Sequence, residues 1–312
     1  VREISRKGND LRVVIESPSG AYWGERIDRI CTALHHDAPG SIDRFVLVFV
    51  SQGATVAEQV VLRDAWVMKN TGLLAKADLT AAVLPREPRQ PPLVIDPLWT
   101  NEEKALSFAV IPGLTTNIGG PNGFILYQAS AAFPLYWKLA ESTSLTGSMN
   151  VALFDNFGHF TYDAPSNLPR VRTYMREYME ASRITVPNLQ ITHVGKLNHD
   201  QYYSVYGGLL ESMYSGLGSE WLYRPWQSRL AFGVDLNWVR QRDFKQNFQF
   251  RDYQTVTGHA TAYWDTGWQS THIKLSAGRY LAKDLGVTFD ISRSFSNGVV
   301  MGAWATKTNV SA

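Results

Sequence analysis

The sequence predicts a mainly β protein, an antiparallel transmembrane β-barrel of about eleven strands preceded by a small α/β module. Three observations predict this fold class. Long segments carry an apolar residue at every second position, tyrosine and tryptophan gather at the ends of these segments, and short glycine-containing turns join them. The 312 residues include 14 Tyr, 14 Phe, 10 Trp and 24 Gly, a composition that favours strands and tight turns over helices.

The segment from Leu230 to Trp238 shows the alternation most clearly, with apolar residues at even positions and small or polar residues at odd positions. The segment from Leu285 to Ser292 repeats it with the parity reversed. A period of two places the apolar side chains on one face of a strand. The residues expected to face lipid are Leu230, Phe232, Val234, Leu236, Leu285, Val287, Phe289 and Ile291.

Two further features favour a membrane barrel over a soluble sheet. A membrane strand needs about 9 to 11 residues and a soluble strand averages about 5 or 6; most of the alternating segments are of the longer kind. Their second face carries Gly, Ser, Thr and Asn with isolated charges, which suits a wet barrel interior. Aromatic residues at segment ends, such as Tyr223, Trp226 and Trp264, match an interfacial girdle, although rings closing the ends of a soluble barrel are the alternative.

The remaining chain divides into two parts. Residues 1–84 are predicted to form a small α/β module in the order β-α-β-β, with strands near 11–17, 44–53 and 55–66 and a helix near 24–38. Residues 85–104 form a connector, because the five prolines between Leu84 and Trp99 prevent a helix or a central strand. Residues 105–312 form the barrel segment. No apolar run approaches the roughly 18 residues of a spanning helix.

Composition and motifs exclude several functions. The net charge is +2 with the charges scattered, so we expect no nucleic-acid partner. Cys31 is the single cysteine and is expected to be a small buried residue. His35 and His36 lack a third ligand at a recognisable spacing, so we expect a solvated helix end and no metal site. The glycine-rich "NIGGPNG" precedes a strand, which predicts a turn and no cofactor.

We expect no enzyme. His193, His199, His259 and His272 lie in four different segments with Ser and Asp nearby, so a barrel-embedded hydrolase with a Ser/His pair is a distant alternative. No nucleophile elbow or helical metal motif supports it.

The inner face of a membrane barrel is polar and in contact with water. The expected lumen-lining residues are Glu220, Arg229, Asp235, Asn237, Thr288 and Asp290. Alternatively, these side chains pair with one another and hold neighbouring strands of the barrel wall together. The long segment 155–188 contains a stretch of helical spacing after Pro169. We expect a helix there, which acts as a constriction or plug against the barrel, lies at the membrane surface, or packs as a loop helix without a gating role.

Three strings carry a family resemblance: "YSGLGSEWLYRPWQSRLAFGVDLNWVRQRDF", "FRDYQTVTGHATAYWDTGW" and "LSAGRYLAKDLGVTFDISRSFSNGVVMGAWATKTNVSA". They resemble the carboxy-terminal part of the YjbH/GfcD family of outer-membrane exopolysaccharide-export proteins. The resemblance extends through "LPRVRTYMREYM" and the module. Compared with a complete member, the sequence lacks an export signal and an aromatic-terminated last strand, so we expect a piece of a longer polypeptide.

The resemblance implies a Gram-negative outer-membrane β-barrel with a periplasmic amino-terminal module, acting in secretion or assembly of an extracellular polysaccharide. It implies as partners a polysaccharide, outer-membrane lipid and other envelope proteins encoded with the polysaccharide genes. It supplies no catalytic residues. The main alternative is a general porin or a structural outer-membrane assembly factor.

Overall fold

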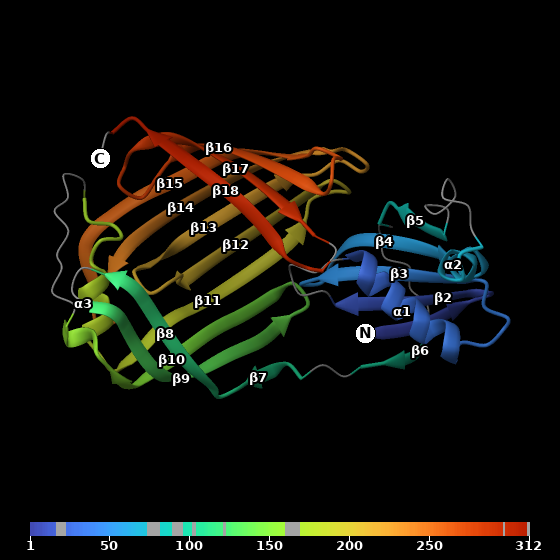
Figure 1. Cartoon of the computed structure of the whole chain (residues 1–312), viewed down its shortest axis with the longest axis horizontal. Helices are drawn as coiled ribbons and strands as arrows, with labels where there is room; N and C mark the ends of the chain where they lie inside the picture. Colours follow the sequence, from blue (N-terminus) through green and yellow to red (C-terminus); the bar gives the residue numbers. More distant parts are fainter. Residues whose placement is uncertain are drawn as a thin grey trace.

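The structure, a computed structural model, describes residues 1–16, 23–73, 82–88, 96–101, 104–120, 123–159, 169–295 and 297–310. These residues form a six-stranded sheet and a 12-stranded sheet that lie side by side (Figure 1). The mainly β, antiparallel fold that the sequence predicted is confirmed. Within the described ranges, no helix combines the length and the apolarity that crossing a bilayer requires.

The six-stranded sheet belongs to the amino-terminal module and has the order β5-β4-β3-β2-β1-β6. Its pairs are antiparallel except for β2 and β3, which run parallel because α1 crosses between them. Its elements are β1 (Glu3–Lys7), β2 (Asp10–Glu16), α1 (Trp23–Asp37), β3 (Arg44–Ser51), β4 (Ala54–Leu62), α2 (Arg63–Asn70), β5 (Val83–Arg86) and β6 (Pro97–Thr100).

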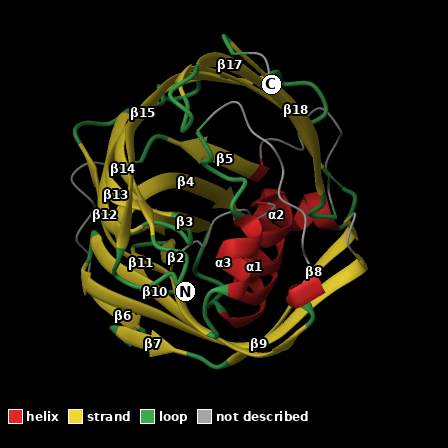
Figure 2. Cartoon of the chain, turned by 90° about the vertical axis from the view of Figure 1, so that its left-hand side faces the viewer, coloured by secondary structure: helices red, strands yellow, loops and turns green. Residues whose placement is uncertain are grey.

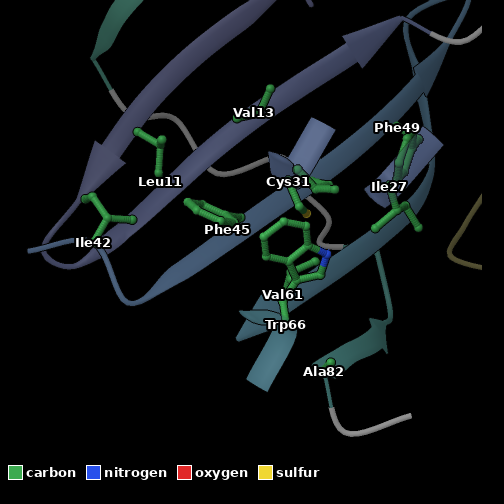
Figure 3. Close-up of a cluster of buried hydrophobic side chains, with 11 residues drawn as sticks. Leu11, Val13, Ile27, Cys31, Ile42, Phe45, Phe49, Val61, Trp66 and Ala82 are labelled. Atoms are coloured by element: carbon green, nitrogen blue, oxygen red, sulfur yellow. The ribbon is translucent and has the colours of Figure 1, made fainter. Parts of the chain in front are cut away.

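The core of the module lies between one face of this sheet and its two helices (Figure 3). Phe45 and Phe49 of β3 pack with Ile27 and Cys31 of α1 and with Trp66 of α2. Burial raises the pKa of the Cys31 thiol to about 12, so Cys31 is an unreactive, small buried residue, as predicted.

The module has more elements than the predicted β-α-β-β order, since β1, α2, β5 and β6 were not predicted. The strand predicted through Trp66 ends at Leu62, and α2 begins at Arg63. The Arg63 side chain donates to the carbonyl oxygens of His35, in the last turn of α1, and of Pro39 just after it, and the Trp66 indole donates to Asp28 at 3.1 Å. These long-range bonds stabilise the turn into a helix. In addition, β6 lies in the range assigned to the connector and pairs with β1.

The 12-stranded sheet follows the order β18-β17-β16-β15-β14-β13-β12-β11-β10-β9-β7, with β8 also paired to β9. Its strands curl through a ring (Figure 2), and each ladder is antiparallel. The strands are β7 (Leu106–Phe108), β8 (Ile111–Gly120), β9 (Gly123–Ala140), β10 (Thr143–Asp155), β11 (Ile184–Lys196), β12 (Gln201–Leu209), β13 (Tyr214–Tyr223), β14 (Leu230–Arg242), β15 (Phe250–Asp265), β16 (Thr271–Arg279), β17 (Leu285–Ser294) and β18 (Val300–Thr308).

The ring is open among the described residues, because no ladder joins β8 to β18. One end of the ring faces the module, and we call it the module end (Figure 1). The opposite end holds the long connection between β10 and β11, with the 3₁₀ helix η2 (Phe157–His159) and α3 (Met175–Glu180), and we call it the α3 end. The predicted helix is therefore shorter than expected, since it begins at Met175 and not near Pro169.

The module contacts the ring through a few polar groups. Lys196 at the end of β11 donates to the Thr55 carbonyl at 3.0 Å, and Arg2 forms an ion pair with Glu141. The β3–β4 turn lies directly against the β9–β10 turn. Gly53 has a φ of +77°, and a Cβ there would lie 2.6 Å from the Glu141 carbonyl oxygen. The contact between the two parts therefore requires a glycine at this position.

Candidate lumen of the twelve-stranded sheet

In a water-soluble sheet the apolar face is buried and the polar face is exposed, and the 12-stranded sheet shows the opposite arrangement. All eight residues expected to face lipid are exposed, between 38% and 57%. Between them on β14 and β17, Asp235, Asn237, Thr288 and Asp290 are half-buried and Gly233 is buried. The apolar face is thus the exposed one, and the polar face is the more enclosed one.

The polar face lines the inside of the ring. Figure 2 shows α3 within the ring, and Tyr178 of α3 packs on Val239 of β14. Val239 lies two and four residues from Asn237 and Asp235, and therefore shares their face of the strand. We call this inward face the lumen wall and the opposite face, which carries Leu230 and Val287, the outer face.

Polar side chains of the lumen wall form a chain of contacts across the strands. The Tyr206 hydroxyl donates to Asn237 Oδ1 at 2.7 Å, and Asn237 Nδ2 donates to Asp235 Oδ2 at 3.1 Å. His259 Nδ1 lies 3.3 Å from both carboxylate oxygens of Asp235. The His259 ring meets Tyr280 at 4.8 Å between centroids. This arrangement offers hydroxyl, amide and carboxylate groups beside aromatic rings, a set of groups that can hydrogen-bond to sugars and stack on them.

The chain of contacts continues to the last strand. Tyr280 and Thr288 hydroxyls lie 2.6 Å apart, and the Thr288 and Thr306 hydroxyls lie 2.8 Å apart. We call this set the lumen chain: Tyr206, Asn237, Asp235, His259, Tyr280, Thr288 and Thr306.

The other predicted lumen residues lie near this chain or at the rim. Glu220 is directly opposite Asp235 in the β13–β14 ladder. Asp290 lines a hollow of about 390 Å³ towards the module end. Arg229 lies in the turn before β14, where its guanidinium donates to the Thr266 carbonyl at 3.4 Å. It therefore lies at the module-end rim and not along the wall.

The lumen wall borders hollows at both ends. Towards the module end, a second hollow of about 440 Å³ lies between Glu220, Asp235 and Tyr263 and adjoins the first at Arg224 and Tyr263. At the α3 end, the wall packs against α3 around a hollow of about 360 Å³ lined by Phe157, Met175 and Tyr178. Tyr178 packs there with Met213, Tyr214 and Val239 in a compact apolar cluster. We call α3 together with residues 170–174 the plug segment.

Inward side chains of the strands hold the plug segment by hydrogen bonds. Gln241 Nε2 donates to the Arg170 carbonyl, and the Tyr214 hydroxyl donates to the Val171 carbonyl at 3.1 Å. The Tyr178 hydroxyl donates to the Arg242 carbonyl at 2.5 Å, and Gln246 Nε2 donates to the Tyr178 carbonyl at 2.7 Å. The segment is therefore fixed to the wall at several points.

Arg242 is the main anchor at this end, and the sequence analysis missed it. Its side chain is fully buried, and its terminal nitrogens donate to five carbonyl oxygens, those of Val186, Pro187, Glu211, Gln246 and Asn247. The β14–β15 register shifts between Arg240 and Arg242, which breaks the alternation from which inward residues were predicted. The only sequence signal is an arginine that ends a long alternating segment.

The four histidines weighed as hydrolase candidates do not come together. His193 lies on the outer face against Thr143 and Tyr203, His199 lies 3.6 Å from Glu87 of the module, and His272 is exposed. His259 has Asp235 as a partner, but its buried Nε2 bonds to no hydroxyl in the described part of the chain. The residues that the structure describes also contain no group of three His, Cys, Asp or Glu side chains suited to a metal ion.

The fold and this wall define a class: a curled antiparallel sheet with an apolar outer face, a polar inner face and an amino-terminal α/β module. A family model described as exopolysaccharide biosynthesis protein YbjH matches residues 1–312, and the chain belongs to this YjbH family. The lipoprotein YjbH of Escherichia coli strain K12 is 42% identical over 220 residues, which cover 68% of this chain. The match covers 31% of that relative, so the chain spans only a part of its length. No solved structure matches.

Proposed function

We propose that the chain is the membrane part, with one periplasmic module, of an outer-membrane β-barrel protein that acts in the secretion or assembly of an extracellular polysaccharide. The single observation that carries the proposal is that the apolar face of the 12-stranded sheet is exposed while its polar face is enclosed. Fully burying a Val, Leu, Ile or Phe side chain contributes about 1.5 to 3 kcal/mol. A continuous face of such residues is unfavourable in water and favourable against lipid.

The lengths of the strands support the same proposal. The strands from β8 to β18 have between 9 and 18 residues, and about 9 to 11 tilted residues suffice to cross the hydrocarbon. A barrel also satisfies the backbone groups that an open edge would leave unpaired in lipid.

The directions of the edge strands support closure through one further strand. Ten successive antiparallel ladders lead from β8 to β18, so β8 and β18 run in the same direction. Bacterial outer-membrane barrels have an even number of antiparallel strands. We therefore propose that a further strand, from outside the described residues, pairs with both edges.

The lumen wall and the family support the polysaccharide as cargo. The lumen chain presents hydroxyl and carboxylate groups beside Tyr206 and Tyr280, and sugars carry many hydroxyls that hydrogen-bond to such groups. The family description concerns exopolysaccharide biosynthesis. The name of the relative, a lipoprotein, supports a place in the cell envelope. Other envelope proteins of the polysaccharide system are the proposed partners, and we propose no enzymatic activity.

The plug segment distinguishes this proposal from a general porin. Tyr178, Tyr214 and Val239 pack together at the α3 end, where they narrow the lumen and oppose free diffusion of small solutes. Export predicts that deleting the gene abolishes extracellular polymer and leaves small-solute permeability unchanged; a porin predicts the reverse result. A structural assembly factor predicts that cells still export polymer normally when the lumen of this protein is blocked.

The membrane part of the proposal is tested at two adjacent residues of β17. With Cys31 changed to Ser, single cysteines at Val287 and Thr288 each carry a small fluorophore in the reconstituted full-length protein. Because adjacent strand residues face opposite sides, we expect quenching at position 287 by a quencher on lipid tails. At position 288 we expect quenching by a water-soluble quencher. If tail-attached quenchers reach neither site, or both equally, the outer face does not contact lipid and the proposal is wrong.

A further inference from the structure

A groove of about 410 Å³ interrupts the outer face of β12, β13 and β14 towards the α3 end. Small residues, among them Ser215, form its floor, and large apolar residues form its walls. Leu217 and Trp238 face each other across the β13–β14 ladder beside it. The lining consists of Leu189, Gly208, Leu209, Ser215, Gly216, Leu217, Trp238, Arg240, Phe248 and Phe250.

The groove is a fixed feature of the backbone. Gly208 has a φ of +128°, and a Cβ there would lie 2.3 Å from the Leu189 carbonyl oxygen. A Cβ at Gly216 would lie 2.0 Å from the Trp238 carbonyl oxygen. Neither position accepts a side chain without a backbone shift. Both glycines share the inward parity of Tyr206 and Tyr214, so they fix the close approach of the backbones beneath the groove, and the buried Ser215 forms its outward floor.

Arg240 places a positive charge beside this apolar groove. Its guanidinium lies 5.6 Å from the centre of the Phe250 ring, and its Nε donates to the Arg251 carbonyl at 2.9 Å. These two contacts fix the side chain in position. In the part of the chain that the structure describes, its two terminal nitrogens have no hydrogen-bond partner. They are available to a negatively charged group.

The depth of Arg240 suits a lipid headgroup. Arg240 lies six residues after Val234, near the middle of the apolar series on β14, which is roughly 20 Å along the strand at about 3.3 Å per residue. For a strand tilted by about 40°, this is roughly 15 Å in depth. Half of the hydrocarbon thickness is also about 15 Å, so Arg240 lies at the polar boundary when Val234 lies at the midplane.

We propose that this groove binds an anionic lipid of the leaflet away from the module, with one acyl chain along the groove and a headgroup phosphate on Arg240. The inference rests on the proposed membrane location. Ser215, Trp238 and Arg240 alone in the lining carry hydrogen-bonding side-chain groups, which suits a hydroxyl-rich sugar polymer less than an acyl chain, and the charge of Arg240 favours an anionic headgroup over a neutral one. A flexible acyl chain also fits the narrow hollow between Leu217 and Phe250.

The test uses the full-length protein, purified in detergent and titrated with dioleoyl phosphatidylglycerol or dioleoyl phosphatidylcholine while native mass spectrometry counts retained lipids. We expect one retained phosphatidylglycerol and about fivefold weaker retention of phosphatidylcholine, the factor expected for one basic residue at a membrane surface. Ser215→Leu fills the floor and is expected to abolish retention of both lipids. Arg240→Gln is expected to retain both lipids equally.

Matched controls lie on the same face. Ser219→Leu adds the same bulk on β13 away from the groove, and Arg279→Gln removes a charge on the outer face of β16; both are expected to behave as the wild type. If Ser215→Leu does not fold, Phe248→Ala removes a wall at an exposed loop position and should lower retention. Equal retention of the two lipids by the wild type overturns the inference, as does unchanged retention in Ser215→Leu or, in its place, Phe248→Ala.

The outcome is separate from the proposed function. A protein that shows the quenching expected at Val287 and Thr288 but retains no lipid disproves the lipid site alone. A protein that fails the quenching test disproves the membrane location, whatever lipid it retains.

Discussion

Tyr178 of α3 donates its phenolic hydrogen to the backbone carbonyl of Arg242 on β14, at 2.5 Å. Desolvation by burial raises the pKa of Tyr178 to about 12, so the phenol stays protonated and donates this bond throughout the neutral range. The same ring packs against Phe244 with 5.1 Å between centroids. One side chain thus joins the plug segment to the wall by both a hydrogen bond and apolar contacts.

We expect Tyr178→Ala to release the plug segment and open the α3 end. Truncating a buried aromatic side chain costs about 3 to 5 kcal/mol, a loss that falls on the plug contacts because the strand ladders do not involve Tyr178. Conductance of the reconstituted protein in planar bilayers should rise. Tyr178→Phe, which loses one hydrogen bond of roughly 1 kcal/mol, should remain close to the wild type. Equal conductance of all three proteins would show that the segment does not close the lumen.

Arg242→Met is expected to destabilise the whole α3 end. The guanidinium satisfies five carbonyl oxygens, and leaving buried acceptors unpaired costs about 1 to 3 kcal/mol for each group. We expect a loss of at least about 3 kcal/mol, measured by thermal unfolding in detergent followed by circular dichroism. Arg279→Met, at an exposed position of β16, is the control and should unfold like the wild type. A wild-type unfolding temperature for Arg242→Met would contradict the assigned role.

Gly53→Ala is expected to separate the module from the ring. The substitution costs about 1 to 2 kcal/mol at a positive φ, and the new Cβ meets the Glu141 carbonyl oxygen at 2.6 Å. Gly8→Ala is the matched control, because Gly8 also has a positive φ, +60°, but open space around its Cβ position. Energy transfer between fluorophores on Asp64 of α2 and Lys245 of the β14–β15 loop should fall for Gly53→Ala alone. A similar fall in both variants would assign the effect to backbone strain.

The contact between module and ring should weaken in acid. The hydrogen bond from Arg2 lowers the pKa of Glu141 below its usual value, against a smaller opposing effect of burial. The carboxylate therefore contributes to the contact above its free pKa of about 4.5, and this contribution is lost as the pH falls through the lowered pKa. Amide hydrogen exchange of Gln52 and Gly53 should be faster in Glu141→Gln than in the wild type at pH 6. The difference should shrink as the pH is lowered below 4.5; a difference that stays constant over the whole acid range would rule out Glu141 as the titrating group.

Much of the strand structure was predictable from the sequence. The alternation over Leu230–Trp238 and Leu285–Ser292 fixes which side chains share a face, because successive residues of a strand point to opposite sides. The continuous apolar run of β3 likewise predicts a buried strand, since both of its faces are covered. Each of these features depends on local geometry alone.

The start of α2 and the plug contacts could not be predicted in this way. Arg63 begins a helix because its side chain reaches carbonyl groups in the last turn of α1 and just after it, at least 21 residues earlier in the sequence. Arg242 faces inward because the register shifts beside it. Neither effect has a periodic signal, since each depends on groups that only folding brings together.

The sequence by itself determined the mainly β fold, the division of β14 and β17 into an apolar and a polar face, and the resemblance to the YjbH family. The sequence also predicted which face turns inward. Only the tertiary structure decided that Asp235 meets His259 and Asn237 there, and that α3 packs on the wall at one end of the ring. The physical reason is that alternation is a property of one strand, whereas the curvature of a sheet and the contacts inside it depend on the register of all its strands.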